Sequence, residues 1–240
     1  MPNVASCIAH HDGRFRTLAE IARTVKTPHT TWVVYDKDDD PTVPVVERLL
    51  PTYPDVRLLK NDLGRGVLNA IKKGFAQVAA DGLVLVVMAD LSDDLAQVDL
   101  MYRRIADDGW DLVCGSRYMR GGKQIGGPPW KGFLSRLAGV TLNALAGLPT
   151  RDGTNAFRMY RASVLREIPI ESKGGFELSL ELTVKAWRAG FRVTEVPSVW
   201  RDRTAGESRF KFREWLPSYI KWYLLAYARL RPGERRPRSR

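Results

Sequence analysis

Apolar and polar positions along the chain follow two kinds of pattern. Short apolar runs, each bounded by polar or glycine-containing turns, recur at 4–10, 31–35, 56–59, 83–88 and 111–116. The segments between these runs carry apolar residues at helical spacing. The runs predict strands and the intervening segments predict amphipathic helices. Strands that alternate with helices indicate an α/β fold with a doubly wound, mostly parallel sheet and helices on both of its faces.

The run at 83–88 (LVLVVM) is continuously apolar, which predicts a central strand buried on both faces. It ends in an acidic turn that contains Asp90, Asp93 and Asp94. Ligands of open α/β sheets bind at the carboxyl ends of the strands. The turn therefore favours a site for a divalent cation and a phosphate. The alternative is a solvated acidic turn in which Ser92 or Asp94 caps the next helix.

The second half of the chain is less regular. Residues 118–129 contain four glycines and two prolines and predict a long loop. After this loop we expect helices and strands in the order helix 131–146, strand 156–160, helix 177–189 and edge strand 192–200.

Residues 212–230 predict a last helix that carries an aromatic stripe, which consists of Trp215, Tyr219, Trp222, Tyr223 and Tyr227. Cations lie around the stripe, so one interpretation is an amphipathic helix at a membrane interface. The other is a helix docked on the core of its own domain or on a partner. The pattern does not decide between them.

Composition limits the class of protein. The 240 residues, 44% of them hydrophobic, suit one large domain with or without an appendage. Cys7 and Cys114 both lie in strand-like runs and are expected to be core residues of a reducing compartment. The first residues lack the pattern of a signal peptide, and no apolar stretch is long enough to span a membrane. We therefore expect a cytoplasmic chain, with the option of peripheral binding to the cytoplasmic face of a membrane.

The net charge of +11 predicts anionic partners. Residues 229–240 alone hold six arginines and one glutamate. Nucleic acid, an anionic lipid surface and phosphorylated substrates all satisfy this charge. We do not expect nucleic acid, because the remaining cations are dispersed in glycine-containing loops; a non-catalytic module that binds nucleic acid or an anionic surface is the less favoured alternative.

Two acidic turns are expected to meet at one edge of the sheet. The first contains Asp36 and Asp40 and follows the strand at 31–35; the second follows the strand at 83–88. Between them, Gly64 and Gly66 open a helix, and the N–H groups of a helix N-terminus suit phosphate binding. These features together predict a site for a nucleotide diphosphate.

Basic residues outside the predicted helix faces supply the other half of this site. They are Arg117, Lys131, Arg158, Arg203 and Arg209. If both substrates carry phosphate, the metal-binding cleft holds one phosphate group and a second must be bound by cations that face the cleft. Arginine and lysine side chains are suited to that second role.

Four segments, read in order, resemble the dolichol-phosphate mannose synthases. They are GSRYMRGG (115–122), RDGTNAFRMYR (151–161), GFE (175–177) and EVPSVWRDRTAGESRF (195–210). These synthases and related polyprenyl-phosphate glycosyltransferases are inverting enzymes of the family-2 type with a GT-A fold. The resemblance covers about 35–210 and implies a GT-A domain, which we expect over 1–210. The residue pattern predicts an amphipathic helix over 211–230 and a basic tail over 231–240. The resemblance also implies Mg²⁺ or Mn²⁺, a nucleotide-sugar donor and a polyprenyl-phosphate acceptor.

The resemblance extends to single donor-site positions. Asp36 and Asp40 are similar to the aspartates of the family's nucleotide-binding turn, in which Tyr35 replaces the first aspartate. Asp90 is similar to the second aspartate of the DxD metal motif, whose first aspartate is Met88 here. We expect Asp93 or Asp94 to supply the missing carboxylate, because hard cations bind oxygen ligands.

On the acceptor side, Arg117, Ser135 and Arg203 are similar to positions that bind the acceptor and its phosphate. Lys131 stands where the family usually has arginine, and Asp152 begins a segment that resembles the family's D-[ST]-GFR. The family's proline–tyrosine–asparagine–glutamate signature after the first strand is replaced by residues 9–12. The donor therefore stays open between the GDP-mannose and UDP-glucose types.

The expected reaction is a metal-assisted displacement at the anomeric carbon, with Asp90, Arg117 and Arg203 as its catalytic residues. A phosphate monoester is largely ionised at neutral pH, since its second pKa is about 6, and needs no general base. A hydroxyl acceptor such as a glycan would need one, and the candidates are then Asp152, Glu177 and Glu181. A helix-capping or ion-paired role is the alternative for these three. Met88 also leaves open a catalytically inactive homologue.

Overall fold

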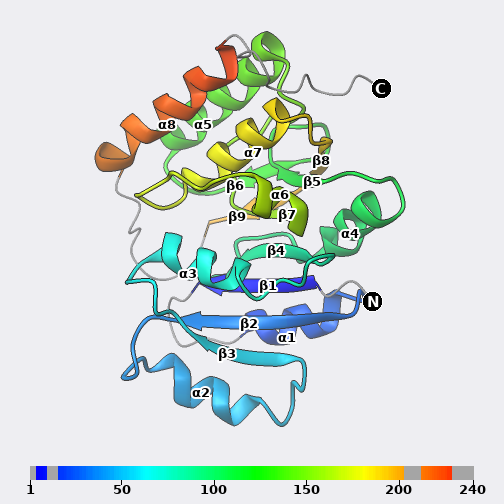
Figure 1. The fold of residues 1–240 in the computed structure, drawn as a ribbon, viewed down its shortest axis with the longest axis vertical. Coiled ribbons are helices and arrows are strands. Elements are labelled where there is room, and N and C mark those ends of the chain that lie inside the picture. The colour runs from blue at the N-terminus through cyan, green and yellow to red at the C-terminus, as the bar shows by residue number, and fades with distance from the viewer. Residues whose placement is uncertain (1–3, 10–15, 203–211, 229–240) are drawn as a thin grey trace.

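The continuously apolar run forms strand β4 (Leu83–Met88), which is buried as far as Val87. It lies in the middle of a seven-stranded sheet with the order β3-β2-β1-β4-β7-β5-β8 (Figure 1). Burial along a whole strand requires cover on both faces of the sheet. The computed structural model describes residues 4–9, 16–202 and 212–228, and the side chains of residues 16–202 and 216–228.

The sheet is mostly parallel, as the sequence predicts. The strands that pair in parallel with a neighbour are β1 (Val4–Ala9), β2 (His29–Tyr35), β3 (Val56–Lys60), β4, β5 (Leu112–Ser116) and β8 (Val193–Pro197). One strand, β7 (Arg158–Arg161), runs antiparallel between β4 and β5. A strand was expected at 156–160. The pattern of apolar residues does not indicate whether a strand runs parallel or antiparallel to its neighbours.

Helices cover both faces of the sheet (Figure 1). One face packs against α1 (Arg16–Thr24), α2 (Thr42–Leu49) and α4 (Val98–Ala106). The other packs against α3 (Val67–Phe75), α6 (Ala162–Glu167) and α7 (Leu178–Arg188). Alternate residues of β4 enter the two cores: Leu85 and Val87 enter one, and Val84 and Val86 the other. This confirms the expected doubly wound arrangement.

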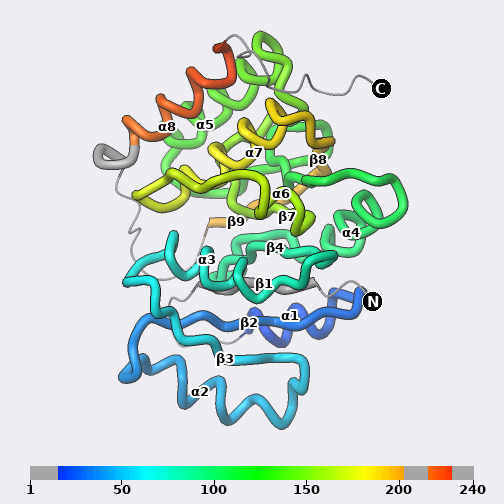
Figure 2. Tube along the Cα trace, viewed as in Figure 1, coloured from blue at the N-terminus to red at the C-terminus, as the bar shows by residue number. Residues whose placement is uncertain are grey.

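A further layer lies outside α7. It contains α5 (Pro129–Thr141), which continues as a π-helical segment (Leu142–Ala146), and α8 (Phe212–Tyr227). Figures 1 and 2 show α5 and α8 side by side at one end of the molecule. The two helices are joined directly, because Thr141 Oγ1 lies 2.9 Å from Tyr223 OH.

The expected loop at 118–129 contains a strand. β6 (Lys123–Ile125) pairs in parallel with β9 (Val199–Arg201) in a separate two-stranded sheet. The expected edge strand at 192–200 is therefore divided between two sheets, with Ser198 at the break. Strands of three residues are too short to show a periodicity, so the sequence pattern could not separate them.

Two smaller features complete the fold. A short 3₁₀ turn (Leu95–Gln97) precedes α4. Cys114 is buried in β5 as a free thiol, as expected, whereas the side chain of Cys7 lies outside the described part. In the regions that the structure describes, no helix combines the length and the apolar character needed to cross a bilayer.

Candidate active site

The first acidic turn is joined to the glycine turn through Asp36. Its Oδ1 accepts a hydrogen bond from Asn61 Nδ2 at 2.7 Å, and its Oδ2 accepts one from Gly66 N at 2.9 Å. Gly64 and Gly66 have φ angles of 101° and 116°, which glycine adopts without strain. The structure thus brings Asp36 and both glycines together at the carboxyl edge of the sheet, as expected for a nucleotide-binding turn.

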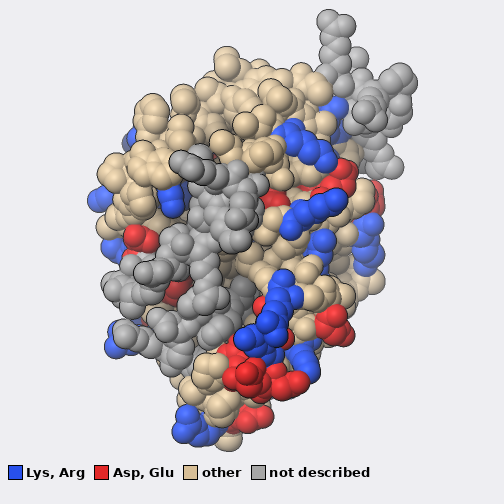
Figure 3. Space-filling model, turned by 90° about the vertical axis from the view of Figure 1, so that its left-hand side faces the viewer, with Lys and Arg blue, Asp and Glu red and all other residues tan. Residues whose placement is uncertain are grey.

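Asp40 has a local role in the same turn. Its Oδ1 accepts a hydrogen bond from Thr42 N at 2.9 Å, at the first residue of α2. Asp38 forms an exposed ion pair with Lys60 at 2.6 Å. Figure 3 shows acidic and basic side chains gathered next to each other on this side of the molecule. Asp36 is therefore the carboxylate of this turn that contacts the glycine loop.

Each carboxylate of the second acidic turn accepts a hydrogen bond from a different part of the main chain. Asp90 Oδ1 accepts from Ser92 N at 3.0 Å, and Asp93 Oδ2 accepts from Met88 N at 2.8 Å. Asp94 Oδ2 accepts from Val199 N at 3.0 Å, which ties the turn to β9. The side chain of Asp94 makes no capping bond to the 3₁₀ turn that follows it. The alternative in which the side chain of Asp94 caps the next helix is therefore wrong.

The three carboxylates do not form one ligand cluster. Among the described residues, no group of three or more His, Cys, Asp or Glu side chains is placed to hold a metal ion. Asp93 and Asp94 each accept a hydrogen bond from the main chain, at β4 and at β9, and the expected pairing of Asp90 with one of them stays a prediction. Asp90 fits a different kind of site, because Mg²⁺ commonly binds one or two carboxylates together with phosphate oxygens of a substrate.

Asp93 has an unusual protonation equilibrium. Burial raises the pKa of Asp93 to about 7, and the neighbouring charge of Asp90 acts in the same direction. The hydrogen bond from Met88 N opposes this rise without cancelling it. Without a bound cation, Asp93 therefore holds its proton to a higher pH than an exposed aspartate does.

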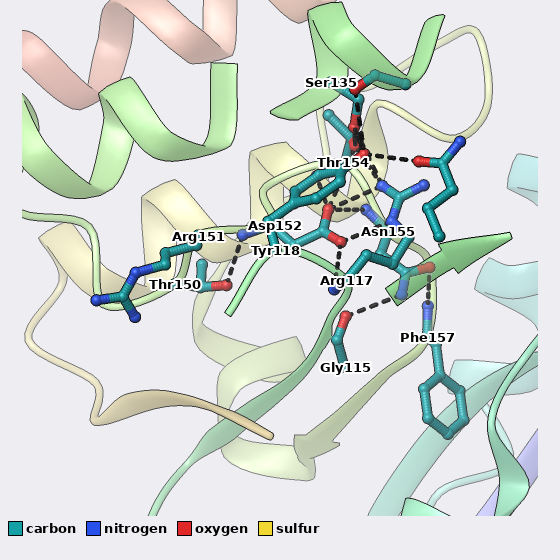
Figure 4. A network of polar contacts seen from close by, with 12 residues as sticks. Gly115, Arg117, Tyr118, Ser135, Thr150, Arg151, Asp152, Thr154, Asn155 and Phe157 are labelled. Carbon is teal, nitrogen blue, oxygen red and sulfur yellow. Dashed lines mark hydrogen bonds and ion pairs between the residues drawn. The ribbon is translucent and has the colours of Figure 1, made fainter. Parts of the chain in front are cut away.

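A polar network lies at the end of β5 (Figure 4). Arg117 donates from Nε to Asp152 Oδ2 at 2.7 Å and from Nη2 to Asp152 Oδ1 at 2.9 Å. Burial of Asp152 would raise its pKa, but the charge and hydrogen bonds of Arg117 outweigh burial and hold this pKa below its ordinary value. The two side chains thus form a buried, bidentate ion pair.

The same guanidinium contacts α5. Arg117 Nη2 donates to Ser135 Oγ at 3.1 Å and to Thr154 Oγ1 at 2.9 Å. Tyr118 OH donates to Ser135 Oγ at 2.9 Å, and the Tyr118 ring centroid lies 4.9 Å from Arg117 Cζ. The structure therefore brings together two of the expected acceptor-site residues, Arg117 and Ser135. Within the described part of the chain, Arg117 Nη1 donates no hydrogen bond.

Two expected substrate contacts are wrong. Arg158 lies in β7 and is fully buried, and it donates to Asn155 O at 2.7 Å, to Asp152 O at 2.6 Å and to Thr183 Oγ1. Asp152 is also fully buried, as the counterion of Arg117. Neither side chain is exposed to a substrate. Arg158 instead holds the turn that carries Asp152, a role that depends on the antiparallel insertion of β7.

The remaining expected cations fall in other places. Lys131 lies in the first turn of α5, where the helix at 131–146 was expected to begin, with Nζ 5.5 Å from the ring centroid of Trp130. Arg203 and Arg209 lie outside the described residues.

Two buried glutamates shape the segment before α7. Glu177 accepts hydrogen bonds from Gly174 N at 2.7 Å and from Gly175 N at 2.6 Å. Glu181 accepts from Ser172 N at 2.8 Å and pairs with Lys185 at 2.6 Å. Both are fully buried. The structural role therefore holds for these glutamates.

The last helix is docked on the core of its own domain. Trp222 is buried between α7 and the π-helical segment, with Lys185 Nζ and Lys221 Nζ at 4.8 and 4.1 Å from its ring. Arg188 of α7 donates to Ala228 O at 2.6 Å, at the end of α8. In the described part of the stripe, Trp222 is buried, and Tyr219 and Tyr223 are partly buried and pack beside it. These aromatic side chains face the protein.

The opposite faces of α5 and α8 are apolar and exposed. Among the described residues, twelve large apolar side chains are exposed, and ten of them lie on α5, its π-helical continuation and α8. We call these ten the outer apolar face: Trp130, Phe133, Leu134, Leu137, Val140, Leu145, Leu216, Ile220, Leu224 and Tyr227. Sequence reasoning missed the contribution of α5, although its apolar residues recur at helical spacing.

The outer apolar face is tied to the polar network beneath it. A Cβ atom at Gly139 would lie 2.0 Å from Arg151 O, so α5 contacts the turn that carries Asp152 without space for a side chain. Ser135, on the same helix, contacts Arg117. The helix therefore has an apolar outer side and a side that contacts the candidate active site.

Comparisons with known proteins agree with this geometry. A family model described as Glycosyl transferase family 2 matches residues 16–169. The undecaprenyl-phosphate mannosyltransferase of Micrococcus luteus is 33% identical over 183 residues, which cover 74% of each chain. The polyprenol monophosphomannose synthase of Mycolicibacterium smegmatis is 32% identical over 199 residues, which cover 76% of this chain and 74% of the relative.

Solved structures show the same fold. Glucosyl-3-phosphoglycerate synthase from Mycobacterium tuberculosis, in complex with Mn²⁺, UDP and glucosyl-3-phosphoglycerate, matches with a TM-score of 0.66 and 16% identity, covering 94% of this chain and 80% of that chain. A mannosyltransferase from Pyrobaculum calidifontis in complex with GDP-Man and Mn²⁺ matches with a TM-score of 0.56 and 14% identity. The match covers 96% of this chain and 66% of that chain. At these identities the likeness concerns the fold.

Proposed function

This chain belongs to glycosyl transferase family 2, and we propose that it moves a sugar from a nucleotide-diphosphate donor to a polyprenyl phosphate, with inversion at the anomeric carbon. The observation that carries this proposal is the contact of Arg117 with Ser135 directly beneath the outer apolar face. A site for a phosphate next to an apolar surface suits a phosphorylated lipid. The names of the two relatives favour mannose as the sugar. We therefore prefer a donor of the GDP-mannose type to one of the UDP-glucose type.

The donor would lie along the carboxyl edge of the sheet. Asp36 holds the glycine turn in place through Gly66 N, which leaves the N-terminus of α3 open to a phosphate. Asp90 would hold a divalent cation together with the donor's diphosphate oxygens. When bound, Mg²⁺ or Mn²⁺ would supply positive charge against the leaving diphosphate.

The acceptor phosphate would be oriented by Arg117 and Ser135. Because Asp152 neutralises the charge of Arg117, the guanidinium contributes direction more than net charge. Its Nε and Nη2 are fixed by Asp152, Ser135 and Thr154 before any substrate binds. Such preorganisation lowers the cost of positioning the nucleophile. Lys131 supplies a further positive charge at the start of α5, and the role expected for Arg203 stays a prediction.

The state of the buried carboxylates supports a phosphate nucleophile over a hydroxyl. A hydroxyl acceptor needs a general base, and the candidates were Asp152, Glu177 and Glu181. All three are fully buried and hydrogen-bonded within the protein. A lipid phosphate that is already ionised needs none of them.

The outer apolar face supports docking on a bilayer at the cytoplasmic face of a membrane. Contiguous exposed apolar surface of this kind marks an interaction site. Arg136 is exposed on α5, so a positive charge lies on the same helix as the apolar side chains, as binding to anionic lipid requires. A bilayer would also deliver the lipid acceptor to the helix that carries Ser135.

The direct test is a transfer assay on the purified chain. Labelled GDP-mannose and UDP-glucose would be offered with polyprenyl phosphate, with the matching polyprenol and with a free glycan, in Mn²⁺ and in EDTA. We expect transfer to the phosphate alone and loss of transfer in EDTA. Arg117→Lys should reduce transfer at least tenfold, whereas Arg104→Lys, in an exposed pair with Asp108, should not. Transfer to the glycan in place of the phosphate would overturn the proposal.

The role of Asp90 needs its own variant. Asp90→Ala should abolish metal-dependent transfer, because it removes the carboxylate that we expect to hold the cation together with the donor's phosphate oxygens. Asp38→Ala, in an exposed ion pair of the first turn, is the matched control and should retain most of the activity. Full turnover by Asp90→Ala would show that this metal site is wrong.

A further inference from the structure

A basic hollow lies beside the candidate donor site. It has a volume of about 250 Å³ and lies between the start of α3 and the segment 172–174. Three of its eight lining residues are cations and none is acidic; the lining consists of Arg65, Gly66, Leu68, Asn69, Lys72, Ser172, Lys173 and Gly174. A cavity with this charge suits an anion.

The cations of the hollow have no carboxylate partner in the part of the chain that the structure describes. Arg65, Lys72 and Lys173 form no ion pair with these residues. The neighbouring Lys73, in contrast, pairs with Asp62 at 2.8 Å and does not line the hollow. Adjacent lysines of one helix are thus used differently, and the unpaired one faces the hollow.

The N-terminus of α3 adds main-chain donors. The helix begins after Gly66 without a side-chain cap and without an acidic residue in its first turn. Leu68 and Asn69, in this first turn, line the hollow. The unpaired N–H groups of a first helical turn and the helix dipole both favour a bound anion.

Ser172 gives an independent indication of a ligand. It is 4% exposed and lines the hollow, and its Oγ has no hydrogen-bond partner among the described residues. A buried hydroxyl without a partner costs free energy, so native proteins usually satisfy it. An anion in the hollow would accept a hydrogen bond from this hydroxyl.

The walls of the hollow are fixed before a ligand binds. Glu181 holds Ser172 N at 2.8 Å, and Glu177 holds Gly174 N at 2.7 Å. On the other side, Gly66 N donates to Asp36 Oδ2 at 2.9 Å. The hollow is therefore preformed and shares Gly66 with the nucleotide-binding turn.

We propose that this hollow is a phosphate-binding site, built by Arg65, Lys72, Lys173, Ser172 and the N-terminus of α3, and distinct from the Arg117–Ser135 site. It binds the anion without a metal, because its donors are cations, a hydroxyl and main-chain N–H groups. The assignment of a source for the phosphate rests on the proposed function. The donor's diphosphate and the acceptor's phosphomonoester share the chemistry that the hollow recognises.

Calorimetry with inorganic phosphate and pyrophosphate in EDTA tests the site without transferase activity. The variant Lys72→Gln/Lys173→Gln should bind pyrophosphate at least tenfold more weakly than the unaltered chain. Ser172→Ala should bind it about tenfold more weakly, in line with the loss of one hydrogen bond to a charged group. Lys73→Gln is the matched control and should bind normally. Lys72→Arg/Lys173→Arg should retain binding.

Absence of binding to the unaltered chain, or equal binding by the double Gln variant at an unchanged melting temperature, would overturn the proposal. Kinetics then identify the source of the phosphate. A tenfold higher KM for the nucleotide sugar alone assigns the donor, and a higher KM for polyprenyl phosphate alone assigns the acceptor. If the chain transfers no sugar but loses pyrophosphate binding on mutation, the site stands and the proposed function fails.

Discussion

Arg117 and Asp152 form an ion pair in which Arg117 Nε lies 2.7 Å from Asp152 Oδ2, with side-chain exposures of 10% and 0%. Burying two charges is expensive, and good geometry offsets that cost only while both partners are present. Ser135 and Thr154 share the guanidinium, so the pair also connects the end of β5 to α5. Removal of one partner should therefore affect stability and activity together.

Asp152→Asn is expected to lower the free energy of unfolding by about 3 kcal/mol, because it leaves the Arg117 charge buried without a counterion. It should also reduce transfer to polyprenyl phosphate, since Arg117 loses its fixed orientation. Urea denaturation at pH 7 measures the first effect. The matched control is Asp108→Asn, which breaks an exposed pair with Arg104 and should cost about 0.5 kcal/mol or less. Equal costs for the two variants would contradict this account.

The sequence identified the fold because the strands of the first half are continuous apolar runs separated by helical segments. The sheet, its parallel strands and the cover on both faces all follow from that pattern. The resemblance predicted that Arg117 and Ser135 belong to one site, and the structure places these two side chains in contact. Their role in binding the acceptor stays a prediction.

The roles of Arg158 and Asp152 could not be predicted in the same way. Both are charged residues in a polar segment, and charge in such a segment normally indicates exposure. Their burial follows from the antiparallel insertion of β7 between β4 and β5, which is a property of the whole sheet. Similarly, the hydrogen bond from Val199 N to Asp94 Oδ2 joins residues that are far apart in the chain, so no local pattern predicts it.

The raised pKa of Asp93 gives a prediction for the pH dependence of stability. An unfolded Asp has a pKa of about 3.9, so between about pH 4 and pH 7 the folded state binds more protons than the unfolded state. The free energy of unfolding should therefore fall as the pH rises through this range. Asp93→Asn keeps an acceptor for Met88 N and removes the charge. We expect the variant to be more stable than the unaltered chain at pH 8 by up to about 4 kcal/mol, and similar to it at pH 4.

Denaturant unfolding in EDTA at several pH values measures this difference. Asp108→Asn again serves as the control, because it removes a carboxylate from an exposed surface pair. A difference between Asp93→Asn and the unaltered chain that stays constant from pH 4 to pH 8 would rule out the titration of Asp93 as its cause.

The two sides of α8 should respond differently to truncation. Trp222 is 2% exposed and packs on α7, so Trp222→Ala should cost about 3 kcal/mol through the cavity it creates. Leu224 is 59% exposed on the other side, and Leu224→Ala should change stability by about 0.5 kcal/mol or less. Thermal or urea unfolding of both variants checks the docking of the helix. Similar costs would show that α8 is not docked through Trp222.

Binding to a bilayer should depend on the outer apolar face. Leu137→Glu/Leu224→Glu places a charge on each of its two helices and should reduce flotation with anionic liposomes at least tenfold, without lowering the melting temperature. Transfer to polyprenyl phosphate in liposomes should fall, whereas transfer to a short, water-soluble phosphate acceptor should persist. Ala79→Glu/Ala96→Glu adds the same charge at exposed positions elsewhere and is the control. Undiminished flotation of the first variant would contradict docking through this face.

The close contact of Gly139 with Arg151 O sets a short distance between α5 and the turn that carries Asp152. If α5 rests on a bilayer, Ser135 and Arg117 then stand at a constant height above the lipid. The enzyme would select its acceptor by how far the phosphate projects from the membrane surface. The rest of the hydrocarbon tail would stay in the bilayer and would not contact the enzyme. Polyprenyl phosphates of different chain length would consequently be equivalent substrates once they are embedded in the same membrane.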